Sequence, residues 1–201
     1  SLAGLIVLIG VRLFGGAIHV SRRDFGILSL VGILMFVGGN GMITYAEKFV
    51  PSGIASVLAA TSPLFLALME TLWPRGEKLR PLGWFGLLTG VSGVIVLLLP
   101  KLRNPTAFIG DWSSLMVLGS AFCWAAGSFL LRHWKVSVSQ FASAGYQMLL
   151  GGISMSAVAL LVGEDLGELF NATLFSWMWW LFLVVIGSIA TYSAYLWLVK
   201  N

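Results

Sequence analysis

Long apolar stretches separated by short polar connections dominate the pattern along the chain. Each stretch is close to the about 20 apolar residues that a membrane-spanning helix needs. None shows the strict alternation of a membrane β-barrel strand. The pattern therefore predicts an all-α integral membrane protein, a polytopic helix bundle. The expected spans cover residues 2–20, 25–46, 52–73, 81–99, 111–132, 139–162 and 175–199.

The composition indicates that lipid is the solvent for most of the chain. Of 201 residues, 58% are hydrophobic and 10% are charged, against about 25% charged in an average soluble domain. The 24 glycines suit membrane helix interfaces, where small residues let two backbones approach. The single cysteine, Cys123, permits no internal disulfide, and His19 and His133 belong to no metal-ligand cluster. We therefore expect no enzyme activity, no metal and no cofactor.

Lysine and arginine gather on one side of the predicted bundle. Cytoplasmic loops of membrane proteins carry an excess of these residues, so we expect that side to be cytoplasmic. The net charge of +4 is then a signal of topology, and a nucleic-acid partner is not expected. The basic side holds Arg22, Arg23, Arg75, Lys78, Arg80, Arg132, Lys135 and Lys200, whereas the opposite side holds Lys48, Lys101 and Arg103.

The segment around residue 40 resembles the segment around residue 192. With an offset of 152, Asn40 falls on Tyr192 and Lys48 falls on Lys200. The two segments cross the membrane in opposite directions, which is the signature of an inverted-repeat transporter. We expect ten helices in the full protein, as an inverted 5+5 repeat, with one helix preceding this chain and two following it. Residues 1–100 would then hold the last four helices of the first repeat, and residues 101–201 the first three of the second.

Several motifs resemble one family of membrane carriers. The stretches GNGMITYAEK, VPSGIA and SPLF, followed by a GE.L pattern, resemble the first EamA repeat of the drug/metabolite transporter superfamily. The stretch GDWSSLMVLGSAFCWAAGSFLLR resembles the opening of a second such repeat, and the chain is especially similar to the YedA-like inner-membrane permeases. The resemblance implies a ten-helix inverted-repeat carrier of small metabolites, often an exporter.

Two polar stretches inside apolar spans are candidates for substrate binding. Asn40 and Thr44 are four residues apart and therefore share a helix face, and an Asn that faces lipid without a partner is costly. Thr61 and Ser62 lie beside Pro63, which frees a backbone carbonyl near the midplane, and broken helices at that depth mark binding sites in carriers. The alternatives are structural: a hydrogen bond between helices and a kink repaired by a neighbouring hydroxyl.

Polar and aromatic residues of the later spans complete the predicted site. Trp124 and Gln147 lie about 20–22 Å from the predicted outer edge, and an indole with an amide suits a small organic substrate of mixed polarity. Ordinary core packing is the alternative for both. Tyr192 and Tyr195 share a face of the last span. The predicted substrate-binding residues are Asn40, Thr44, Thr61, Ser62, Trp124, Gln147, Tyr192 and Tyr195.

Arg12 and Glu70 are the charges that lie well inside apolar runs. Intramembrane charges are functional candidates whose partners need to be identified. The two residues are predicted to form an ion pair or a proton-coupling site, and the alternative is that Arg12 extends its side chain to the membrane surface. Glu70 also departs from the apolar residue that is usual in the family.

Together these features predict a secondary transporter of the bacterial inner membrane. It would move small metabolites, amino-acid-like compounds or drugs by alternating access, as an exporter. The expected partners are the lipid bilayer and a small-molecule substrate, with a homodimer as a further option. The alternatives are a seven-helix membrane receptor and a structural membrane protein without transport activity. The receptor interpretation treats seven spans as complete and leaves the inverted repeat unexplained.

Overall fold

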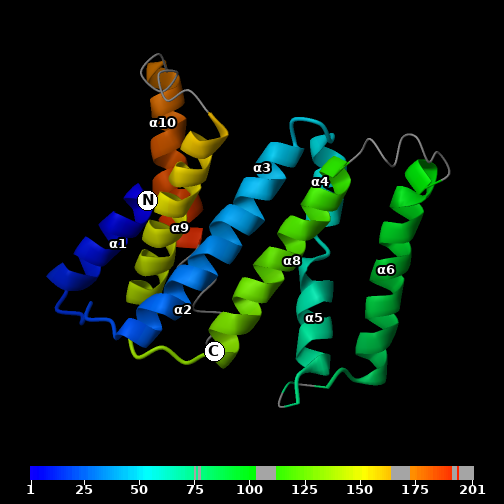
Figure 1. The fold of residues 1–201 in the computed structure, drawn as a ribbon, viewed down its shortest axis with the longest axis horizontal. Coiled ribbons are helices and arrows are strands. Elements are labelled where there is room, and N and C mark those ends of the chain that lie inside the picture. Colours follow the sequence, from blue (N-terminus) through cyan, green and yellow to red (C-terminus); the bar gives the residue numbers. More distant parts are fainter. Residues whose placement is uncertain (75, 77, 103–111, 164–172, 192–193, 195–201) are drawn as a thin grey trace. The chain divides into compact units, whose positions relative to one another are not determined.

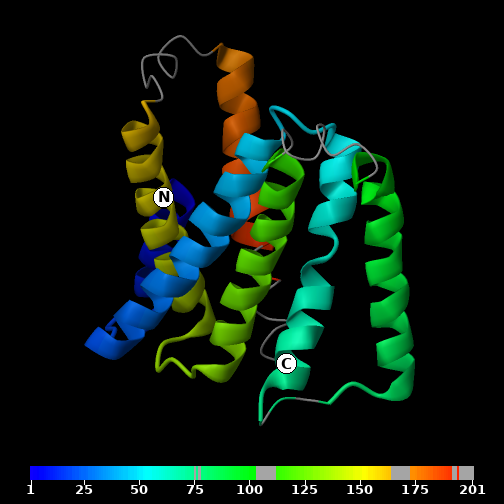
Figure 2. The same cartoon turned by 45° about the vertical axis from the view of Figure 1, so that its right-hand side comes forward.

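The computed structural model of the chain describes residues 1–74, 76, 78–102, 112–163, 173–191 and 194, and the regular elements of this described part are all helical (Figures 1 and 2). In chain order the elements are α1 (Leu2–Leu13), α2 (Arg22–Gly32), η1 (Ile33–Gly41), α3 (Met42–Ala46), α4 (Ser52–Ala59), α5 (Ser62–Leu72), α6 (Pro81–Leu102), α8 (Trp112–His133), α9 (Gln140–Val162), α10 (Leu174–Phe182) and η3 (Leu183–Ala190).

The helices confirm the prediction of an all-α polytopic membrane bundle. In the described part, four helical stretches are long and apolar enough to cross a membrane. Three further apolar helices are shorter, with 10–17 described residues each. The ends of α8 and α9 agree with the predicted spans within a residue or two. The four long stretches are Arg22–Ala46, Ser52–Leu72, Trp112–His133 and Gln140–Val162, and the shorter ones are Leu2–Leu13, Pro81–Val96 and Leu174–Ser188.

The chain divides into two compact units, one of residues 1–37 and 131–201 and one of residues 38–130. In the first unit, α9 packs against both α1 and α2 (Figure 1). Glycines allow the backbones to touch there. A Cβ atom built on Gly32 of α2 would lie 2.8 Å from the backbone oxygen of Gln147, and one built on Gly151 of α9 would lie 2.7 Å from the backbone oxygen of Gly32. Any larger residue at these positions would push the helices apart.

The first helix is shorter than the sequence suggested. We predicted a span over residues 2–20, but α1 ends at Leu13. The physical reason is Gly15, whose φ of +76° is a left-handed conformation that glycine adopts without steric cost and that commonly ends helices. The apolar residues that follow belong to a link held on α9, where the Tyr146 hydroxyl donates to the Ile18 carbonyl at 2.7 Å.

The start of α2 is fixed to the connection that precedes α9. Ser21 caps α2, since its hydroxyl oxygen accepts a hydrogen bond from the Asp24 backbone N–H at 3.1 Å. The Asp24 side chain is buried, and its carboxylate accepts hydrogen bonds from the backbone N–H of Ser137, at 3.0 Å, and from the Ser137 hydroxyl. Leu28 and Ala142 are fully buried in the adjacent apolar cluster. The buried charge therefore has partners, and it ties the start of α2 to the connection before α9.

In the second unit, α8 packs against the elements on either side of the connection between α3 and α4. Ala46 of α3, Leu58 of α4 and Val117 of α8 are fully buried in one cluster. Further along, the ring of Phe65 in α5 lies edge-on to that of Phe122 in α8, with 5.7 Å between centroids. Figure 2 shows α6 beside α5 at the edge of this unit. This packing positions the irregular segments described next.

Candidate functional site

The helix that carries Asn40 changes type within the membrane span. It begins as α2, becomes a π-helix over Ile33–Gly41 and returns to α-helix in α3. The run Gly-Gly-Asn-Gly at the end of the π-helix has low α-helix propensity, and π-helical turns are rare and frequent at functional sites. Asn40 and Thr44 are both exposed. Among the described residues, Asn40 makes no side-chain hydrogen bond to another helix, so nothing described supports the structural alternative for it.

The predicted break before Pro63 lies between α4 and α5. Pro63 has no N–H, and the Ala59 carbonyl instead accepts a hydrogen bond from the Ser62 hydroxyl at 2.8 Å. The Thr61 hydroxyl donates to the Leu58 carbonyl at 2.6 Å. The local geometry is thus the hydroxyl-repaired kink that we considered as an alternative. The repair uses both hydroxyl protons, yet each oxygen keeps lone pairs that can accept a hydrogen bond from a ligand.

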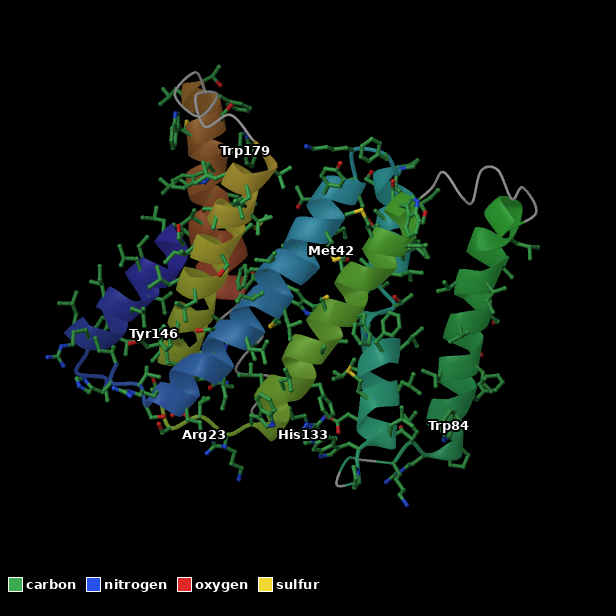
Figure 3. The ribbon with its side chains drawn as sticks, in the orientation of Figure 1. Arg23, Met42, Trp84, His133, Tyr146 and Trp179 are labelled. Carbon is green, nitrogen blue, oxygen red and sulfur yellow. The ribbon has the colours of Figure 1, made fainter. Side chains whose placement is uncertain are left out.

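Met42 of α3 and the elements on either side of the break both pack against α8 within the second unit. Met42, which directly follows the π-helix, packs its methyl group against Gly119, where an added Cβ would be 2.9 Å away (Figure 3 labels Met42). The break lies between Leu58, which packs beside Val117, and Phe65, which contacts Phe122. Residues 117–122 of α8 therefore contact Met42 of α3 and residues on both sides of the break.

The π-helix and the break carry polar but uncharged groups. Asn40 offers an amide donor and acceptor, and Thr61, which is buried, and Ser62, which is half-buried, offer hydroxyl oxygens. Trp124, two residues beyond Phe122 on α8, is half-buried. Five of the predicted residues belong to this unit, and their grouping into one site stays a prediction: Asn40, Thr44, Thr61, Ser62 and Trp124. Such a set can hold a neutral ligand by hydrogen bonds and aromatic contact.

Gln147 belongs to the other compact unit and is fully buried there. Its side-chain amide donates to the Ser143 hydroxyl, one turn earlier on α9, at 2.9 Å. Its backbone contacts Gly32 at the α2–α9 crossing. This setting resembles the core packing that we considered as the alternative, and a role in substrate binding stays a prediction.

The last predicted site residues, Tyr192 and Tyr195, lie outside the described residues. The helix that leads to them is nevertheless informative, since it turns from α10 into a second π-helix, Leu183–Ala190. With the offset of 152, residues 33–41 of the first π-helix fall on residues 185–193. The two segments that the sequence comparison aligned therefore share the same rare helix type.

Arg12 and Glu70 lie in settings different from those we expected. Arg12 is exposed in the last turn of α1, because that helix ends at Leu13. The expectation that Arg12 lies well inside a helical span over residues 2–20 is therefore wrong. Glu70 of α5 is buried, and a Cβ on Gly76 would lie 1.9 Å from the Glu70 carbonyl oxygen and 3.1 Å from its Oε2. Gly76 is the glycine of the GE.L pattern, and only glycine fits there. The ion pair of Arg12 with Glu70 stays a prediction.

Sequence reasoning missed the residues of α8 that face the irregular segments. Ser120 is buried and donates to the Val117 carbonyl at 2.7 Å, and Gly119 provides the flat surface for Met42. The available signal was a run of small residues on α8, from Gly119 to Ala121, between larger apolar ones. Small residues in a membrane helix favour close approach of a neighbour, but the sequence does not say which neighbour.

Comparison with known proteins adds an independent observation. Residues 1–99 match the EamA-like transporter family. The chain is 33% identical over 202 aligned residues to the protein named "Uncharacterized inner membrane transporter YedA" of Escherichia coli K12, an alignment that covers all of this chain and 63% of that protein. The chain therefore spans less than two thirds of the length of this curated relative.

More distant relatives also have transporter names. The chain is 27% identical over 175 residues to an uncharacterized transporter of Synechocystis sp., covering 81% of this chain and 52% of that protein. It is 28% identical over 151 residues to the riboflavin transporter of Vibrio cholerae, covering 75% of this chain and 48% of that protein. No solved structure matches the chain.

Proposed function

We propose that this chain, which carries an EamA family domain and is homologous to the inner-membrane transporter YedA, is the central part of a secondary transporter that works by alternating access. The chain is a multi-pass membrane protein whose relatives include an inner-membrane transporter. The observation that carries the proposal is that α8 packs against Met42, which directly follows a π-helix, and against both sides of a broken helix. Discontinuous helices at mid-depth form the substrate sites of several transporter folds.

An inverted repeat is the second part of the proposal, and the α1–α9 crossing supports it. Gly4 of α1 packs against Gly145 and Leu149 of α9, while Gly145 packs against Gly4 and Leu8. Gly4 and Leu8 of α1 lie 141 positions before Gly145 and Leu149 of α9, so exchanging the two helices at this offset exchanges the two contacts. Reciprocal contacts of this kind arise where a two-fold axis passes between equivalent elements. Residues 1–100 and 101–201 would then belong to two copies of one unit.

A small, uncharged organic molecule is the substrate class that fits the described residues best. At the π-helix and the break, the side chains that are described are amide, hydroxyl, aromatic or aliphatic, and their charged neighbours Glu47 and Lys48 lie beyond the end of α3. The Vibrio cholerae relative is named as a riboflavin transporter. A heterocyclic metabolite with hydroxyl groups is therefore the first compound type to test, and export is the direction that we propose.

A transport assay with the full-length protein tests the proposal. Purified protein in proteoliposomes should move radiolabelled or fluorescent neutral heterocycles, riboflavin among them, faster than protein-free vesicles. Thr61→Val and Asn40→Ala should lower that rate, whereas Thr89→Ala, which removes an exposed hydroxyl bonded within α6, should not. If no compound in a broad metabolite panel moves faster than in protein-free vesicles, the transport proposal fails and a receptor or structural role is favoured.

A further inference from the structure

An apolar groove lies between α1 and the beginning of α9 within the first unit. Its volume is about 550 Å³. Gly10 leaves the middle of the groove open, since a Cβ atom built on it would have no atom within 4 Å. Phe14, at one end, is 95% exposed. The lining residues are Ile6, Val7, Gly10, Val11, Phe14, Gly16, Ser139 and Phe141.

The groove opens at the basic end of this unit. Arg12 lies between two lining residues of α1, and Arg22 and Arg23 begin α2; all three are exposed (Figure 3 labels Arg23). Lys135, four residues before Ser139, is also exposed. The acid at this end, Asp24, is buried and accepts both hydrogen bonds of Ser137. The exposed charges at this end of the described unit are therefore positive, and Arg12 is accessible to an anion.

The connection between α1 and α2, which borders the groove, is fixed by contacts with α9 and with a buried apolar cluster. The Tyr146 hydroxyl binds the Ile18 carbonyl, and Val20 packs against the buried cluster of Leu28 and Ala142. An apolar groove with fixed walls does not retain water, because water needs polar partners. Its occupant must combine an apolar chain with a negative head.

We propose that the groove binds an acyl chain of an anionic phospholipid from the leaflet on the basic side, and that Arg12 contacts the lipid phosphate. Basic pockets between membrane helices on the cytoplasmic side are suited to anionic head groups. The early end of α1 is what makes this geometry possible, since it places Arg12 at the membrane surface while Val11 and Phe14 remain beside the chain.

Two variants separate the parts of this site. Gly10→Leu should fill the groove without a clash, because the space around Gly10 is open, and Arg12→Gln should remove the charge while keeping the length of the stem. Gly86→Leu is the matched control for the first, since a Cβ on Gly86 of α6 also meets nothing within 4 Å. Lys48→Gln, at the end of α3, is the control for the second.

The experiment compares thermal unfolding of the full-length protein in nanodiscs of phosphatidylcholine alone and of phosphatidylcholine mixed with phosphatidylglycerol. The wild-type midpoint should rise by at least about 2 °C with phosphatidylglycerol, and phosphatidylglycerol should be enriched in lipid extracts of the purified protein. Gly10→Leu and Arg12→Gln should each remove both effects, and both controls should keep them.

Three results would overturn the lipid site. The first is a wild-type midpoint that does not depend on phosphatidylglycerol. The second is an undiminished phosphatidylglycerol effect in Gly10→Leu or in Arg12→Gln. The third is a Gly10→Leu variant that is destabilised in both lipids by several degrees while Gly86→Leu is not, because that pattern would mean that another segment of the protein already fills the groove.

Discussion

The backbone of Gly145 in α9 fills the space that a side chain on Gly4 of α1 would need, and the backbone of Gly4 does the same for Gly145. A Cβ atom on Gly4 would lie 2.6 Å from the carbonyl oxygen of Gly145, and one on Gly145 would lie 3.2 Å from the carbonyl oxygen of Gly4. Backbone rather than flexible side-chain atoms limit the space at Gly4, where the Leu149 amide nitrogen would be 2.4 Å away. The two helices therefore cannot accommodate even a methyl group here without separating.

Gly4→Ala should lower the free energy of unfolding of the full-length protein by about 1–3 kcal/mol, because overpacking forces backbone shifts. Gly10→Ala is the control on the same helix, since its Cβ meets nothing and alanine is the better helix former. Denaturant titration in detergent micelles measures both. Equal stability of the two variants would show that the glycine contact is not tight in solution.

Cysteine labelling should confirm the orientation drawn from the lysines and arginines. In a Cys123→Ser background, an impermeant maleimide added to intact cells should modify Glu168→Cys, which lies outside the described residues, and leave Lys78→Cys unmodified. Permeabilised cells, in which both positions are accessible, provide the control. Modification of position 78 in intact cells would reverse the assignment of the cytoplasmic side.

Asn40→Ala should lower transport per folded molecule while leaving the unfolding midpoint nearly unchanged, because Asn40 is exposed in the described structure and binds no other helix there. Tyr192→Phe should have a smaller effect, since its ring remains able to stack. Both are measured as initial rates in proteoliposomes, divided by the folded fraction from size-exclusion chromatography. A normal rate per folded Asn40→Ala molecule would remove this residue from the predicted site.

The proposed pair of Arg12 and Glu70 can be separated from the lipid site by a double-mutant cycle. If the two charges pair, Arg12→Leu should destabilise the protein more than the Arg12→Leu/Glu70→Leu double variant, because a single survivor is left buried and unpaired. If Arg12 instead binds a lipid phosphate, the losses in free energy of unfolding caused by Arg12→Leu and by Glu70→Leu should add to that of the double variant within about 0.5 kcal/mol. The cycle is measured in nanodiscs with phosphatidylglycerol, and in phosphatidylcholine alone the cost of Arg12→Leu should then disappear.

Hydrophobic pattern was sufficient for the fold class and for the bounds of the long helices α8 and α9, because length and apolarity are what a membrane selects. It failed for α1, where the apolar residues after Gly15 read as more helix although they form a link. The pattern does not distinguish an apolar link that packs under a neighbouring helix from a continued span. The glycine pair at residues 15 and 16 was the signal that deserved more weight.

The candidate site was partly predictable. Pro63 predicted the break, because proline lacks a backbone N–H wherever it occurs and this property is read directly from the sequence. The π-helix at Asn40 could not be predicted. Over only nine residues, the spacing of apolar residues is the same, within its scatter, for α-helical and π-helical hydrogen bonding. Gly119 and Ser120 of α8 were also missed, because their importance depends on which helix packs against them.

The π-helix within the span Arg22–Ala46 has a rotational consequence. In a π-helix each backbone hydrogen bond encloses one more residue than in an α-helix, so the stretch acts as a phase shift between α2 and α3. A helical wheel drawn through residues 22–46 at 100° per residue assigns Thr44 to the wrong side. If the stretch became α-helical with all its residues kept, the Asn40–Thr44 face would turn by about 100° relative to α2, and deleting one residue from the Gly38–Gly39 pair would cancel that turn. The direction in which those side chains point is thus set by a count of residues, independently of which residues they are.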